Sequence, residues 1–146
     1  MNTTIITTYV PKYFRIQELV DPKTYSLLHD GAVVKLEPML CLALDTIKEM
    51  LHRPMTVNNW TSEGPYHWRG LRTTECKEGA PTSQHRLGNA FDFDVEGMTA
   101  EEVRVWLQAH KDAPGLEGIM RMEAKTDWVH IDGAKGHGPR IHIFAP

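Results

Sequence analysis

The 146-residue chain lacks several features that would assign it to a familiar class at once. It has only two cysteines, Cys41 and Cys76, and no C-x-x-C pair, which argues against a zinc ribbon and against a disulfide-rich scaffold. A single Cys41–Cys76 disulfide stays open, although the sequence favours one buried thiol in a helix and one thiol in a loop. The H-E-x-x-H signature of helical zinc proteases is also missing.

Long runs of positive charge or of apolar residues are missing as well. The formal net charge is -3, and no basic stretch accumulates, so we expect no nucleic-acid partner. No apolar run approaches the ~20 residues that span a membrane, so we expect no membrane insertion. The first residues, MNTTIITTYVPKYFRIQ, lack the basic start and apolar core of a secretory signal. We therefore expect synthesis in the cytoplasm, with delivery elsewhere depending on something other than the chain's own signal.

The length and the even composition favour a single domain over residues 1–146. Apolar residues make up 41% of the chain and charged residues 24%, which is ordinary for a soluble globular protein. No internal repeat, low-complexity tract or linker divides the chain. We expect a monomer with a helical part at 1–54 and a core at 55–146 that carries the functional residues.

Hydrophobic periodicity and turn residues predict helices early in the chain and mostly strands later. The clearest helix is Leu36–Leu51, and Thr99 with Glu102 forms a capping box for a second. This order predicts an α+β fold with a small antiparallel sheet and helices packed on one face. The predicted helices are Tyr13–Val20, Leu36–Leu51 and Ala100–His110, with a turn at Asp21-Pro22; the predicted strands are Met55–Trp60, Ala90–Val95, Gly118–Met122, Trp128–Asp132 and Arg140–Phe144, with a long loop at Ser62–Ala80.

Two of the predicted strands carry polar side chains on one face. Because successive side chains of a strand point to opposite faces, Asp92 and Asp94 share a face in AFDFDV, opposite the apolar residues. By the same rule His130 and Asp132 share a face in WVHID. His85 comes just before the first of these strands. Two imidazoles and one carboxylate form a common catalytic zinc set, so the pattern indicates a possible metal site.

Two motifs in this region resemble those of a known family. SQHRLGNAFD (83–92) is similar to the S-x-H-x-x-G-x-A-x-D motif of the D-Ala-D-Ala carboxypeptidase-like zinc metallopeptidases, which share their fold with hedgehog domains and lysostaphin-type peptidases. DWVH (127–130) resembles the second motif, an acidic residue three positions before a histidine. GLRTTECKEGAPTSQH resembles the stretch that leads to the first metal histidine. The resemblance covers roughly residues 55–143.

The resemblance implies roles for individual residues. His85, Asp92 and His130 would bind one zinc ion per chain. Asp127 would be the general base that takes a proton from the attacking water and passes it to the leaving amine. Arg72 matches the family arginine that binds a substrate carboxylate or carbonyl, for which a guanidinium is well suited.

Further positions leave alternatives open. Ser83 would hold substrate or ligand geometry beside the metal. Asp94 and Asp132 either orient metal-binding imidazoles or are solvated strand residues. The family usually has Ser before Gly-[YF]-R, and Arg69 stands there instead, so the substrate arginine is Arg69 or, on register, Arg72. The aromatic segment NNWTSEGPYHW looks like an insertion that forms a substrate wall.

The family resemblance implies a zinc peptidase that hydrolyses peptidoglycan stem peptides, either as an L-Ala–D-Glu endopeptidase or as a D-Ala–D-Ala carboxypeptidase. The aspartate at position 127 resembles the phage endolysin branch, since many members carry Glu there. We therefore expect a bacteriophage or prophage lytic enzyme, released to the cell wall by a holin or carried in the virion. The alternative is a non-catalytic zinc-binding module of the same fold, for example in a phage tail.

Overall fold

The computed structural model describes residues 8–77 and 83–146. This part of the chain contains three α-helices, five short strands and four 3-10 turns. The helices are α1 (Pro22–Leu28), α2 (Pro38–Leu51) and α3 (Ala100–His110), the strands are β1 (Met55–Thr56), β2 (Ala90–Val95), β3 (Arg121–Glu123), β4 (Val129–Asp132) and β5 (His142–Phe144), and the 3-10 turns are η1 (Ile16–Glu18), η2 (His29–Lys35), η3 (Trp60–Ser62) and η4 (Gln84–Leu87).

The strands form one sheet in the order β1-β2-β4-β3-β5. The pairings β1–β2, β2–β4 and β3–β4 are antiparallel, whereas β5 runs parallel to β3. The α+β class is thus confirmed, but an antiparallel arrangement is wrong for the last strand. The reason is topological: the chain leaves β4 and returns beyond β3 rather than beside β4, so β5 runs in the same direction as β3.

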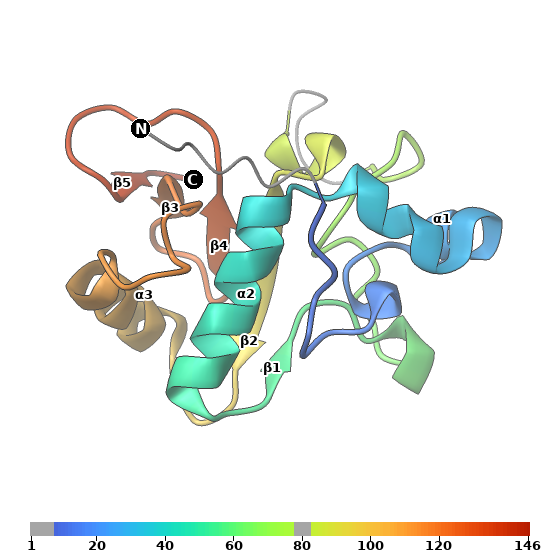
Figure 1. Ribbon diagram of the computed structural model, residues 1–146, viewed down its shortest axis with the longest axis horizontal. Helices are drawn as coiled ribbons and strands as arrows, with labels where there is room; N and C mark the ends of the chain where they lie inside the picture. The colour runs from blue at the N-terminus through green and yellow to red at the C-terminus, as the bar shows by residue number, and fades with distance from the viewer. Residues whose placement is uncertain (1–7, 78–82) are drawn as a thin grey trace.

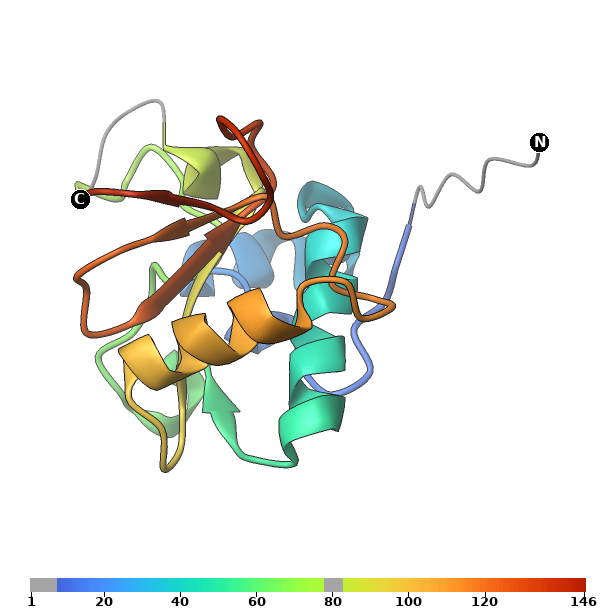
Figure 2. The ribbon, with the colours of Figure 1, turned by 90° about the vertical axis from the view of Figure 1, so that its left-hand side faces the viewer.

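Helices cover one face of the sheet. Figure 1 shows α2 crossing in front of β2 and β4, and Figure 2 shows α3 beside the same strands. Phe91 and Phe93 of β2 and Ile131 of β4 are fully buried in this apolar layer. The opposite face of the same two strands carries Asp92 and His130. The period-2 pattern therefore separates the core from the polar face as predicted.

The start of the chain differs from the sequence prediction. Only η1 forms within the helix predicted at 13–20, and the predicted turn at Asp21-Pro22 is instead the start of α1. Asp21 is the N-cap, because its carboxylate accepts a hydrogen bond from the backbone N–H of Thr24 at 3.0 Å, and Pro22 occupies the first turn, where its missing N–H costs nothing. Proline was thus a helix-start signal here rather than a turn signal.

The strand predicted at 55–60 ends after Thr56. The buried side chain of Asn58 takes over: its Nδ2 donates to the carbonyl of Val20 at 3.0 Å, and its Oδ1 accepts from the N–H of Arg69 at 2.9 Å. Because of these bonds, the chain leaves β2 at Asn58. They also hold the two ends of the segment between Asn58 and Arg69 together. Within the described residues, no helix is both long and apolar enough to cross a membrane.

Candidate metal centre

The β2–β4 ladder places two of the predicted ligands side by side. Asp92 pairs directly with His130 in the antiparallel register, so both side chains leave the sheet on the same face. Asp92 Oδ1 lies 2.9 Å from His130 Nδ1, and both residues are buried. The neighbouring core residues hold the two strands in this register, because a shift by one residue would turn both polar side chains into the apolar layer.

His85 reaches the same point from the 3-10 turn η4. The Ser83 hydroxyl caps this turn by accepting a hydrogen bond from the His85 N–H at 3.2 Å. Gly88 ends it in a left-handed conformation (φ 69°), and a Cβ there would lie 1.9 Å from the carbonyl oxygen of Lys35. The tight turn brings His85 Nε2 to 3.2 Å from Asp92 Oδ2.

The chemistry of these three side chains fits a zinc ion. His85 Nδ1 is occupied by the carbonyl of Gly70 at 2.9 Å, which leaves Nε2 for a metal. His130 Nε2 is occupied by Asp132 at 2.8 Å, which leaves Nδ1. One ligand atom from each of His85, Asp92 and His130 lies within 4.8 Å of the others. Two imidazole nitrogens and a carboxylate oxygen that converge in this way make a three-ligand set of the catalytic zinc type.

The imidazole of His130 is held by a second group of side chains. Arg121 on β3 donates two parallel hydrogen bonds to the fully buried carboxylate of Asp132, each at 2.8 Å. The same guanidinium lies over the ring of Phe144, 4.4 Å from its centroid, and that ring meets the imidazole edge-on at 5.6 Å. Asp132 thus has the geometry of a residue that orients a metal-binding imidazole.

In the protein without metal, His130 and Asp92 strongly shift each other's pKa. Burial by itself lowers the pKa of His130, but hydrogen bonds to Asp132 and Asp92 outweigh burial and raise it to about 9. Burial raises the pKa of Asp92, but hydrogen bonds from His130 and His85 outweigh it and hold that pKa well below its ordinary range. Without metal, the His130 ring thus lies between the carboxylates of Asp92 and Asp132, which favour its charged form.

A hollow of about 570 Å³ opens beside Asp92. Asp127 and Trp128 line it on one side, and both are exposed. Pro65, Tyr66, His67 and Trp68 line it as well, so part of the aromatic segment predicted as a substrate wall does face the cluster. His67, one of these residues, is half-buried.

Both candidate arginines line the hollow, but only Arg72 contacts one of the three predicted ligands. Arg72 Nη2 lies 3.3 Å from Asp92 Oδ2, and its Nε donates to the carbonyl of Trp68 at 2.7 Å. Arg69 Nη1 donates to Asp94 at 2.7 Å, and its guanidinium stacks on Tyr66, 3.7 Å from the ring centroid. Of the two alternatives left open for Asp94, its contact is with Arg69 rather than with an imidazole, because it lies two residues further along β2 than Asp92.

Sequence reasoning missed three contributors to this geometry. Arg121 sits in a short strand that the sequence predicted three residues too early, so nothing linked it to Asp132. The Gly70 carbonyl and the ring of Phe144 come from distant segments whose pairing no local pattern reveals. The structure shows why position 70 is a glycine, since a Cβ there would lie 2.0 Å from the carbonyl oxygen of Leu19. Both cysteines are buried, Cys41 within α2.

Fold and site together define a class: an α+β domain in which a sheet face and a neighbouring turn present a His-Asp-His metal-binding cluster beside an open hollow. Residues 12–132 match the peptidase M15 family model, and the chain belongs to this family. The match takes in the helical first third as well as the two motifs. Membership makes the chain a metallopeptidase, and thus a hydrolase, by family. No curated protein and no solved structure gives a significant match.

Proposed function

We propose that this protein is a zinc-dependent peptidase that hydrolyses peptidoglycan stem peptides. The observation that carries the proposal is the buried cluster of His85, Asp92 and His130, whose free ligand atoms converge beside a hollow that also contains Asp127. Family membership supports peptide hydrolysis. The resemblance of the two motifs to D-Ala-D-Ala carboxypeptidase-like enzymes supports the peptidoglycan substrate.

His85 Nε2, Asp92 and His130 Nδ1 would hold the ion. When bound, zinc supplies Lewis acidity, which activates water near neutral pH and polarises a peptide carbonyl. Asp132 and Gly70 keep the outer imidazole nitrogens occupied, so the free nitrogens point inward.

Asp127 is positioned to move the proton. It lines the same hollow as Asp92, is exposed and has no hydrogen-bond or ion-pair partner among the described residues, so its carboxylate is available to substrate. The water oxygen bonds to the peptide carbonyl carbon while Asp127 accepts a water proton. As the C–N bond breaks, Asp127 returns this proton to the leaving nitrogen, which departs as an amine. Arg72 lies where it can donate to the carbonyl oxygen as negative charge develops there.

The setting proposed for this activity is lysis of a bacterial cell wall by a bacteriophage or prophage. The support is the aspartate at position 127, which resembles the endolysin branch of the family. The enzyme would act after release by a holin or as part of a virion. Turbidity loss of cell-wall suspensions treated with the pure protein tests this setting, and the absence of any loss would count against it.

The function itself is tested on the purified chain with zinc measured by mass spectrometry and peptidase activity measured on muropeptides. We expect one zinc per chain and the release of new amines. Asp127→Ala should lose at least ~100-fold in kcat, the lower range for loss of a general base, while it keeps its zinc. Asp112→Ala, at an exposed aspartate beyond α3, is the matched control and should retain full activity.

Zinc binding without release of amines would instead favour the non-catalytic module. Unchanged activity in Asp127→Ala would mean that Asp127 is not the general base.

A further inference from the structure

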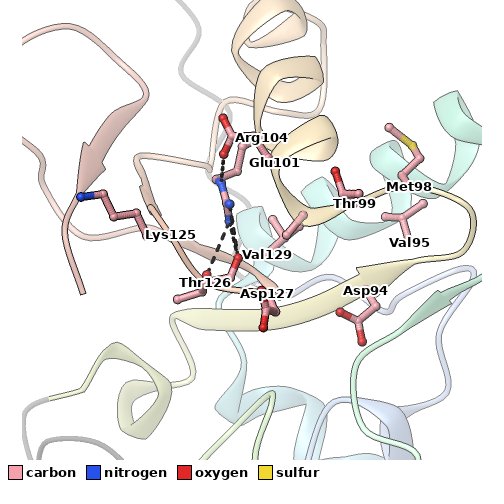
Figure 3. A pocket seen from close by; sticks show the side chains of 11 residues that line it. Asp94, Val95, Met98, Thr99, Glu101, Arg104, Lys125, Thr126, Asp127 and Val129 are labelled. Atoms are coloured by element: carbon pink, nitrogen blue, oxygen red, sulfur yellow. Dashed lines mark hydrogen bonds and ion pairs between the residues drawn. The ribbon is translucent and has the colours of Figure 1, made fainter.

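A second hollow adjoins the metal-site hollow. It has a volume of about 440 Å³ and lies between the start of α3 and the turn that precedes β4. Figure 3 shows the side chains that line it, with Met98 and Thr99 before the helix and Arg104 within it. Its size falls in the ~300–1,000 Å³ range of small-ligand sites, so it is large enough to hold a part of a substrate.

The two hollows meet at Asp94 and Asp127, which line both of them. The β2–β4 ladder ends with the pair Phe93–Val129. The next residue of β2, Asp94, pairs with Thr56 of β1 on the other edge of the strand. Figure 3 shows Asp94 and Asp127 extending to the same side of β2, at the end of the ladder. The residue proposed as the base therefore stands at the boundary between two hollows rather than at a closed end.

The charges in the second hollow do not suit the C-terminal carboxylate of a peptide. A terminal carboxylate requires an available cation, and the Arg104 guanidinium is already occupied: its Nε donates to Glu101 at 2.9 Å, and both its terminal nitrogens lie 3.3 Å from the carbonyl of Thr126. The ammonium of Lys125 points away from Asp94 and Asp127 (Figure 3).

Apart from the carboxylates of Asp94, Glu101 and Asp127, the rest of the lining suits a chain that continues through the hollow. Val95, Met98 and Val129 supply apolar surface, and Thr99 and Thr126 supply hydroxyl groups. Such a mixture favours contact with peptide backbone and small side chains over recognition of a terminal charge.

We propose that the second hollow is a substrate subsite that takes the continuation of the peptide beyond the cleaved bond, which makes the enzyme an endopeptidase. The substrate runs from the hollow lined by Tyr66, past Asp127, into the hollow at the start of α3. This inference rests on the proposed peptidase function and adds the direction in which the substrate extends. It requires neither terminus of the substrate to be free.

The first arm of the test uses the zinc-loaded protein and two N-acetylated synthetic stem peptides, one with a free C-terminal carboxylate and one that is C-terminally amidated. An endopeptidase should cleave both, with kcat/KM values within about threefold of each other. A loss of more than ~10-fold on amidation, the scale expected for a missing charge-assisted hydrogen bond, would overturn the inference in favour of a carboxypeptidase.

The second arm fills the subsite. Ala100 lines the hollow in the first turn of α3, and Ala100→Phe should occupy part of it. The cleaved bond is first identified by mass spectrometry, and two peptides are then made, each truncated on one side of it. Ala100→Phe should lower kcat/KM at least ~10-fold for the full peptide and for one truncated peptide. For the peptide that lacks the segment held by the subsite, Ala100→Phe should leave kcat/KM unchanged.

Val105→Phe, on the exposed face of the same helix, is the matched control and should change none of the three values. Met98→Trp fills the hollow from the loop before α3 and replaces Ala100→Phe if that variant fails to fold. An equal change in kcat/KM for all three peptides, or no change for any of them, would contradict the proposed subsite. If the wild-type protein binds zinc but hydrolyses no peptide, the proposed function itself fails, and the subsite fails with it.

Discussion

The two histidines of the metal centre are held in place by different means. His85 lies on the turn η4, and its outer nitrogen bonds to a backbone carbonyl, that of Gly70. His130 lies on β4, and its outer nitrogen bonds to the Asp132 carboxylate, which Arg121 holds in turn. One imidazole is thus oriented by the path of the chain and the other by a set of side chains.

This difference has a physical consequence. The Gly70 carbonyl is fixed because the next residue, Leu71, donates its N–H to the carbonyl of Leu19 at 3.0 Å, so His85 depends on the packing of the N-terminal part. Asp132, which holds His130, is fully buried and charged, so its loss leaves unpaired charge in the interior. We therefore expect side-chain substitutions to damage the His130 region strongly, and the His85 region mainly through changes in backbone position.

The largest effect is expected for Asp132→Ala. The substitution leaves Arg121 and His130 without their fully buried partner, so the metal-free protein should lose ~3–5 kcal/mol of unfolding free energy. Zinc affinity should fall ~10–100-fold. Urea unfolding and competitive zinc titration measure the two effects. Asp94→Ala, which removes a half-exposed carboxylate paired with Arg69, is the matched control and should cost less than ~1 kcal/mol. Equal losses in both variants would contradict the account.

The corresponding test of the His85 region is Gly70→Ala. The new Cβ would lie 2.0 Å from the Leu19 carbonyl oxygen, so the backbone must shift, at a cost of ~1–3 kcal/mol, and the carbonyl that orients His85 moves with it. Zinc affinity should fall along with stability in the same two measurements. Gly31→Ala has no atom within 4 Å of its new Cβ and should change neither value. Undiminished zinc affinity in Gly70→Ala would mean that the Gly70 carbonyl does not contribute to zinc binding.

A smaller effect is expected for Arg121→Lys, which keeps the charge but removes the two parallel hydrogen bonds to Asp132. Zinc affinity should fall ~10-fold, the lower end of the range for residues that support a ligand. Arg53→Lys, at an exposed arginine whose Nη1 donates to the carbonyl of Glu96, is the matched control and should bind zinc as the wild type does. Wild-type affinity in Arg121→Lys would mean that Asp132 alone orients His130.

The last prediction concerns the dependence of stability on pH. In the metal-free protein, the pKa of His130 rises from 6.5 to about 9 on folding. Protonated His130 therefore stabilises the fold fully below pH 6.5, and this contribution is lost as the pH rises through about 9. Zinc requires the neutral imidazole, so the stabilisation that zinc adds should grow over the same window. Thermal unfolding with and without zinc between pH 6 and 9.5 measures this. A zinc-dependent gain that stays constant with pH would contradict it.

The sequence predicted much of the site because its ligands lie on elements with strong local patterns. The bounds of β2 and α3 agree with the prediction, since alternating Asp and Phe define the strand and Thr99 with Glu102 caps the helix. The alternation of side chains along a strand predicted that Asp92 and His130 lie on polar faces. It did not place them opposite each other, because register depends on how two distant strands pair.

The prediction failed where long-range contacts override local preference. Asn58 ends β1 early through bonds to segments on either side of it, and the β4–β5 connection reverses the expected direction of the last pairing. Arg121, Gly70 and Phe144 contribute only through partners far away in the chain. The ligands were thus predictable from sequence, whereas the groups that orient them were not.

We propose that one zinc ion binds to His85 Nε2, Asp92 and His130 Nδ1. A crystal structure of the zinc-loaded protein, with anomalous data collected at the zinc absorption edge, tests it most directly. We expect one anomalous peak per chain, ~2.0–2.1 Å from the two named nitrogens, with the contact between His130 Nε2 and Asp132 preserved. A peak at His130 Nε2, or a peak away from these three residues, would contradict it.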